Sequence, residues 1–108
     1  MPRRGNELVV ISWRDIPAQV NARAGAEKHQ VVLPRRFQKA IDDAAMVADK
    51  KTASEYVGEW RRASSAIPAG DDVNTAAEAV ARTLKAAFPR ERLAQFVANG
   101  GFDPDAAP

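Results

Sequence analysis

The chain of 108 residues contains no cysteine and only one histidine. Without cysteine, a disulfide framework, a thiolate nucleophile and a thiolate-ligated zinc or iron–sulfur site are all excluded. The single histidine, His29, lies in a segment that reads as a strand, so we interpret it as a structural or solvent-facing residue rather than a catalytic base. We therefore expect no catalytic residues, no metal site and no cofactor, and the protein is predicted not to be an enzyme.

Long apolar runs and a large excess of charge are also missing. No stretch approaches the roughly 18 apolar residues of a membrane-spanning helix, and the run Leu8–Ile11 is too short for the core of a signal peptide. A cytoplasmic protein without membrane contact is expected. The net charge of +2 falls short of the clustered positive face that nucleic-acid binding requires. Six glycines match no phosphate-loop spacing, so nothing supports a nucleotide site.

The length is that of one domain, because compact folds most often contain about 100–150 residues. The hydrophobic content of 45% and the charged content of 28% are typical of a folded globular chain. We expect a single domain over residues 7–100, preceded by a flexible lead at 1–6. The segment 101–108 is rich in Asp, Ala and Pro and is predicted to be a mobile tail.

Two apolar segments predict strands. The run Leu8–Trp13 is expected to end before Pro17, because proline lacks the N–H group that a ladder needs. The second strand, His29–Leu33, is stopped by Pro34. The chain between them gives no strong signal and is too short for a crossover helix, which favours antiparallel pairing of the two strands. A short third strand within residues 64–67 stays open.

Two helices are predicted in the middle of the chain. An apolar stripe with helical spacing runs from Phe37 to Ala48, and Pro34 suits the first turn of that helix. Thr52 and Glu55 have the spacing of a capping box, in which each side chain satisfies a free backbone donor of the other residue. The helix that they begin is expected to run to about Arg62.

Two further helices are predicted near the end of the chain. Asp71 or Asp72 can cap the first of them, and Pro89 can open the second, which the pair Gly100-Gly101 stops. The order of elements indicates an α+β fold, in which a small antiparallel sheet of two or three strands packs against about four helices on one face.

Charged doublets recur along the chain. Asp42 and Asp43 diverge by about 100° on a helix, so they are interpreted as a solvated face rather than a convergent site. Arginine is preferred for bidentate recognition of carboxylate or phosphate, which leaves an anion site open. The arginine doublets are Arg3/Arg4, Arg35/Arg36 and Arg61/Arg62. Positive charge at a helix N-terminus is unfavourable, and we expect Arg35 and Arg36 to be offset by Asp42, Asp43 or other acids.

Two segments combine tryptophan with arginine, the residue types that most often anchor protein interfaces. One lies at the exit of the first strand and the other at the end of the second predicted helix. The candidate interaction residues are Trp13, Arg14, Asp15, Gln19, Trp60, Arg61 and Arg62. The alternative is that both tryptophans fill the core, while Arg14 pairs with Asp15 or caps a helix C-terminus.

Three segments carry a resemblance to a known family: Val10–Val20, which reads VISWRDIPAQV, Leu33–Met46, and Tyr56–Arg62. They resemble the small bacterial domain family described as "virulence factor", which also occurs within larger conserved virulence factor C proteins. The likeness extends over roughly residues 7–100 and brings no catalytic residues with it. Stand-alone members accompany folate-linked one-carbon or methyl-transfer enzymes, which implies an accessory subunit.

The favoured function is a small non-catalytic accessory or interaction domain that acts through a partner protein of unknown identity, with a second copy of the chain also open as a partner. The first alternative is a small subunit that contributes to an anion-binding site of a folate-linked one-carbon or methyl-transfer enzyme complex. The second is a weak nucleic-acid binder that uses the arginine doublets, for which binding would weaken steeply with salt.

Overall fold

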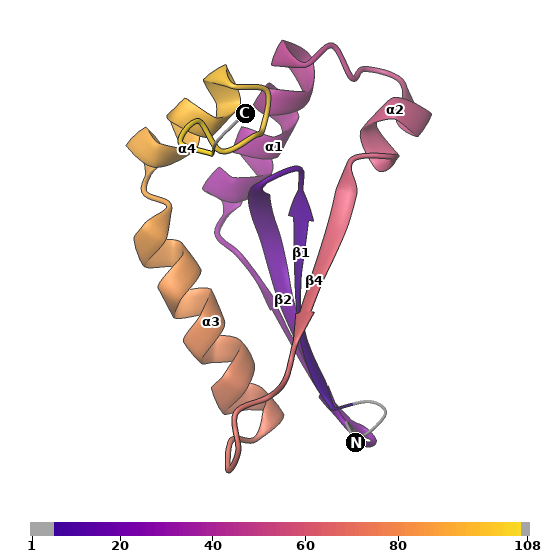
Figure 1. Cartoon of the computed structure of the whole chain (residues 1–108), viewed down its shortest axis with the longest axis vertical. Helices are drawn as coiled ribbons and strands as arrows, with labels where there is room; N and C mark the ends of the chain where they lie inside the picture. The colour runs from indigo at the N-terminus through magenta and orange to yellow at the C-terminus, as the bar shows by residue number, and fades with distance from the viewer. Residues whose placement is uncertain (1–5, 107–108) are drawn as a thin grey trace.

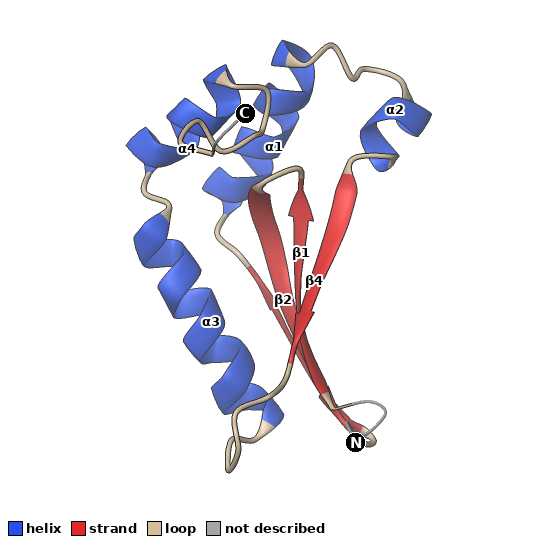
Figure 2. Ribbon diagram, viewed as in Figure 1, coloured by secondary structure: helices blue, strands red, loops and turns tan. Residues whose placement is uncertain are grey.

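The apolar run near the start of the chain forms β1 (Glu7–Trp13) at the centre of a four-stranded antiparallel sheet. The structure, a computed structural model, describes residues 6–106. The strand order is β3-β2-β1-β4, and the helices pack mainly on one side of the sheet (Figures 1 and 2). The α+β class is therefore confirmed, while the expected number of two or three strands is wrong.

The missed strand is β2 (Ile16–Ala24), which pairs with β1 directly after the tight turn at Arg14 and Asp15. β1 ends before Pro17, as predicted, but it ends at the turn, and Pro17 itself lies inside β2. The register between β1 and β2 shifts at this point, and a proline is tolerated at such an irregularity near a strand end. β3 (Glu27–Val32) pairs with β2, so the predicted pairing between the first strand and residues 29–33 is wrong.

The remaining strand, β4 (Trp60–Ser65), pairs with the other side of β1. The preceding helix, α2 (Ala53–Val57), has the predicted capping box at Thr52 but ends before Gly58. Its predicted extension to Arg62 is wrong, because the backbone of residues 60–65 pairs with β1 instead. The strand that was left open within residues 64–67 therefore exists as β4, but it begins four residues earlier, at Trp60.

The other helices match their local signals. They are α1 (Arg35–Val47), α3 (Val73–Ala87) and α4 (Arg90–Ala98). Asp72 caps α3 by accepting a hydrogen bond of 2.7 Å from the Thr75 N–H, and Pro89 precedes α4. Within residues 6–106, no helix combines the length and apolar character needed to cross a membrane.

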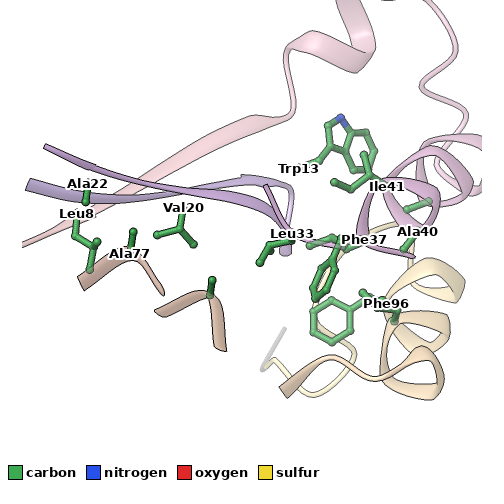
Figure 3. Packing of buried hydrophobic residues seen from close by; sticks show 14 of the residues in the cluster. Leu8, Trp13, Val20, Ala22, Leu33, Phe37, Ala40, Ile41, Ala77 and Phe96 are labelled. Atoms are coloured by element: carbon green, nitrogen blue, oxygen red, sulfur yellow. The ribbon is translucent and has the colours of Figure 1, made fainter. Parts of the chain in front are cut away.

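The core lies between the sheet and three helices. Contacts of α3 with β2 and β3, and of α1 with β2 and α4, make this layer. Figure 3 shows side chains buried in this layer. The largest of those that are fully buried are Trp13, Phe37, Ile16, Ile41 and Val20. α2 stands apart from this layer, at the end of the sheet where β4 begins (Figure 1). The helix cover is therefore centred on β2 and β3, whereas residues 61–65 of β4 are all exposed.

The predicted flexible lead and mobile tail fall partly outside the described residues. Of the lead, only Asn6 is described, and the tail is described as far as Ala106. The mobility of both segments stays a prediction.

Candidate functional site

Arg14 is the centre of a cluster at the turn between β1 and β2. Its backbone is in the left-handed region, with φ of 51°. Its Nε donates a hydrogen bond of 2.7 Å to the Glu59 carboxylate, and its Nη1 donates one of 2.9 Å to the Gly100 carbonyl, just beyond α4. Only 11% of the Arg14 side chain is exposed. Arg14 thus pairs with Glu59 rather than Asp15, and it satisfies a carbonyl at a helix C-terminus.

Asp15 attaches the segment after α4 to the same turn. Its N–H donates to the Gly101 carbonyl at 2.9 Å, and its carboxylate accepts a hydrogen bond of 2.8 Å from the Asp103 N–H. Arg92 of α4 adds ion pairs to Asp103 at 3.3 Å and to Asp105 at 2.8 Å. The start of the predicted tail therefore has several specific contacts with the folded domain.

Trp13 lies in the core beneath this cluster. Its side chain is fully buried, and its indole N–H donates a hydrogen bond of 2.8 Å to the Tyr56 carbonyl. Its ring stacks on that of Tyr56 with a centroid distance of 5.7 Å, and Tyr56 in turn makes an edge contact of 5.9 Å with Trp60. Trp13 is therefore a packing residue, whereas the half-buried Trp60 reaches the surface.

Phe102 forms the exposed part of the cluster. Its ring, which is 38% exposed, lies between the guanidinium groups of Arg14 and Arg61, at 4.4 Å and 5.5 Å from the ring centre. Such cation–π contacts are attractive, by about 0.5–1 kcal/mol at exposed sites. We define the strand-exit surface as the exposed parts of Trp60, Arg61 and Phe102.

The structure brings five of the seven predicted interaction residues together and separates the other two. Trp13, Arg14, Asp15, Trp60 and Arg61 share the cluster, the first three mainly as its support. Gln19 and Arg62 are instead the neighbours of Ile11 in the adjacent strands. Because Val10 and Val20 point toward the helices and side chains alternate along a strand, Gln19 and Arg62 lie on the opposite, open face of the sheet.

The predicted interaction residues did not include Tyr56, Glu59 and Phe102, which are also part of the cluster. Phe102 had a usable signal, because it is the one aromatic residue in a segment otherwise rich in Asp, Ala and Pro. Glu59 had none, since its partner Arg14 lies 45 positions away in sequence.

The arginines at the start of α1 do not form the expected ion pairs. Arg36 donates hydrogen bonds to the carbonyls of Phe88 at 3.1 Å and Lys85 at 2.9 Å. These carbonyls close the C-terminal end of α3, where positive charge is favourable. The predicted pairing of Arg35 and Arg36 with Asp42 and Asp43 is wrong, because Asp43 pairs with Lys39 and Asp42 accepts from Gln38.

His29 also has a partner on another element of the fold. Its Nε2 lies 3.0 Å from a carboxylate oxygen of Glu78 on α3. The contact links the edge strand β3 to the helix layer. Within the described range, no group of three or more His, Asp or Glu side chains is placed to hold a metal ion.

Glu59 is ionised more readily than a free glutamate. The hydrogen bond from Arg14 is the main cause that lowers the pKa of Glu59 below its ordinary value of 4.5. A carboxylate with a lowered pKa stabilises the fold above its unfolded pKa, and this contribution is lost as the pH falls through the folded value.

We therefore expect Glu59→Gln to reduce the acid sensitivity of the fold. Between about pH 5 and pH 3, the free energy of unfolding should fall less steeply for the variant than for the wild type. Urea unfolding at a series of pH values measures this. The matched control is Glu27→Gln, at an exposed carboxylate in β3, which should retain the wild-type slope. Equal slopes for all three proteins would contradict the role of the Arg14–Glu59 pair.

One known family matches the chain over a range that contains part of this cluster. The model of the family described as "Virulence factor" matches residues 11–97, a range that contains the β1–β2 turn, Glu59 and Trp60. No curated protein and no solved structure matches the chain. Since the family model extends over most of the chain, this protein belongs to the virulence factor family.

Proposed function

We propose that this domain is a non-catalytic interaction module that binds an extended, acidic segment of a partner protein along β4. The observation that carries the proposal is the exposure of this edge strand, in which every residue from Arg61 to Ser65 is exposed. An edge strand presents N–H and C=O groups that another chain can use to add a strand to the sheet. β4 is therefore suited to main-chain recognition.

The charge of β4 favours an acidic partner. The strand carries Arg61 and Arg62 and no acidic residue, and opposite charges across a strand pair stabilise it. Antiparallel pairing of β4 with a second copy of itself would instead gather four arginines in one short ladder. Like charges placed opposite each other are destabilising, so a different protein suits the strand better than a second copy.

The strand-exit surface supplies side-chain contacts at the beginning of β4. Trp60 and Phe102 are exposed in part, and Arg61 lies against the Phe102 ring at 5.5 Å from its centre. Aromatic residues and arginine are the most frequent energetic anchors of interfaces. Because Arg14 is hydrogen bonded and also packs on Phe102, the surface is held in place before a partner arrives, which lowers the entropic cost of binding.

Reversal of one charge on β4 tests the proposal. We expect Arg61→Glu to capture at least about tenfold less partner protein from the native host than the wild type does. Charge reversal at a close interfacial pair costs more than 1.4 kcal/mol of binding free energy, which corresponds to about tenfold in affinity. The control is Arg82→Glu, the same change at an exposed position of α3, which should capture as much as the wild type. Cross-linking from β4 should identify an acidic segment in the captured protein.

Two outcomes would contradict the proposal. One is equal capture by the wild type, Arg61→Glu and Arg82→Glu. The other is a partner whose cross-links map to the helix layer and not to β4. Either result would indicate that Arg61 and Arg62 serve to keep an unpaired edge from aggregating, which is a common use of charged residues in edge strands.

A further inference from the structure

A groove lies on the open face of the sheet, at the end where β1 begins. Its volume is about 610 Å³, within the range of small-molecule sites. Residues of all four strands contribute to it, among them Glu7 and Val9 of β1, Asn21 and Arg23 of β2, Lys28 of β3 and Arg62 of β4. The groove is separate from the strand-exit surface, whose three residues do not line it.

Positive charge converges on the groove because of the strand register. Glu7 is opposite Arg23, and Arg23 is opposite Lys28, so the three side chains share one face of the sheet. Arg62 reaches the same place from β4. Three cations and one carboxylate line the groove, although Arg and Lys exceed acidic residues only slightly in the whole chain.

Glu7 shows how a carboxylate fits between the two arginines. One of its oxygens lies 3.8 Å from a terminal nitrogen of Arg23 and 3.8 Å from one of Arg62. Charge-assisted hydrogen bonds are about 2.7–2.9 Å long, so both contacts are loose. The side chains of Arg23 and Arg62 remain 49% and 67% exposed, which leaves both guanidinium groups free to bind a second anion.

The side-chain amide of Asn21, which lines the groove, has an oxygen that is buried and lacks a hydrogen-bond donor within the described part of the chain. A buried acceptor left without a donor is destabilising. A ligand with a hydroxyl group in the groove would supply that donor once the Asn21 side chain turns its oxygen toward the groove.

We propose that the groove binds a small polycarboxylate that carries a hydroxyl group. Its carboxylates bind Arg23, Lys28 and Arg62, where they displace the Glu7 side chain, and its hydroxyl donates a hydrogen bond to Asn21. Glu7 then acts as an internal competitor that occupies the arginines when no ligand is present. This proposal does not depend on strand addition at β4.

The test uses citrate as the probe and tricarballylate as its control, since the two differ by the hydroxyl group. Binding is followed by NMR shifts of the backbone amides at constant ionic strength. We expect citrate to shift amides of β2 and β3 at the groove and to bind roughly fivefold more tightly than tricarballylate, the effect of one hydrogen bond. The preference should disappear in Asn21→Leu.

Two charge variants are expected to change the affinity for citrate in opposite directions, which makes the test specific. Arg23→Gln should weaken citrate binding about tenfold, as expected for loss of a charged hydrogen-bond donor. Glu7→Gln should strengthen it roughly twofold to fivefold, because an exposed competing ion pair is removed. Arg82→Gln, on α3, should leave it unchanged. None of these variants alters β4, so failure here is distinguishable from failure of strand addition.

Several results would overturn the proposal. They are the absence of citrate-dependent shifts at the groove, weaker binding by Glu7→Gln, and an equal loss of binding in Arg23→Gln and Arg82→Gln. Equal affinity for citrate and tricarballylate in the wild type would overturn the assignment of the hydroxyl group to Asn21.

Discussion

Trp13→Ala is expected to lower the free energy of unfolding by about 3–5 kcal/mol, the range for removal of a buried large aromatic side chain. The indole is fully buried, stacks on Tyr56 and donates a hydrogen bond to the Tyr56 carbonyl. Since small domains have a total stability of about 5–15 kcal/mol, this single change would remove much of the stability. Urea unfolding followed by circular dichroism measures it.

Two companion variants separate the contributions at Trp13. Trp13→Phe keeps much of the apolar contact but removes the indole donor of the Tyr56 carbonyl, which then keeps the longer hydrogen bond of 3.3 Å from the Glu59 N–H. We expect a loss of about 1–3 kcal/mol. Trp60→Ala removes a half-buried ring and should lose less than Trp13→Ala. If Trp13→Ala and Trp60→Ala lost the same amount, the assignment of Trp13 to the core and Trp60 to the surface would be wrong.

Gly101→Ala is expected to destabilise the fold by about 2–4 kcal/mol, through backbone strain together with overpacking. Gly101 has φ of 97°, and a Cβ atom there would lie 2.9 Å from Cζ3 of Trp13 and 3.3 Å from Cδ of Arg14. Neither the buried indole nor the doubly hydrogen-bonded arginine can move aside easily. Thermal or urea unfolding of the variant gives the loss directly.

Gly70→Ala is the matched control for Gly101→Ala. Gly70 also has a positive φ, of 88°, but a Cβ atom there would meet nothing within 4 Å. Its expected loss is about 1–2 kcal/mol, from the backbone alone. If both variants lost the same free energy of unfolding, the close approach of Gly101 to Trp13 would not contribute to the effect of Gly101→Ala.

These two residues connect the stability of the fold with the proposed binding surface. Trp13 and Gly101 meet where the β1–β2 turn contacts the end of α4, and Phe102 follows directly in the chain. Loss of packing at this junction should loosen Phe102 from its place between Arg14 and Arg61. Variants of Trp13 or Gly101 are therefore unsuitable as tests of binding. Arg61→Glu leaves this buried junction intact and changes only exposed groups, among them the contact of Arg61 with the Phe102 ring.

The helices were predictable because each carries its own local signals. Thr52 with Glu55, Asp72 and Pro89 mark helix starts within a few residues of sequence. β2 was missed although its even positions are apolar. Three of these positions are alanine, which gives a weak pattern, and Pro17 suggested an end where the structure has a register shift.

β4 and the candidate site depend on contacts between distant parts of the chain. β4 is exposed along most of its length, so it lacks the apolar alternation by which strands are recognised. The Arg14–Glu59 pair spans 45 positions. Convergence of Glu7, Arg23 and Lys28 in the groove follows from strand register, which cannot be derived once β2 is missed.

Strand addition at β4 is the central claim, and amide hydrogen exchange of the isolated complex tests it most directly. If a partner segment pairs with β4, exchange of amides within residues 61–65 should slow in the complex, while exchange in α3 should stay as in the free domain. Unchanged exchange in β4, with new protection confined to α1, α3 or α4, would contradict the claim.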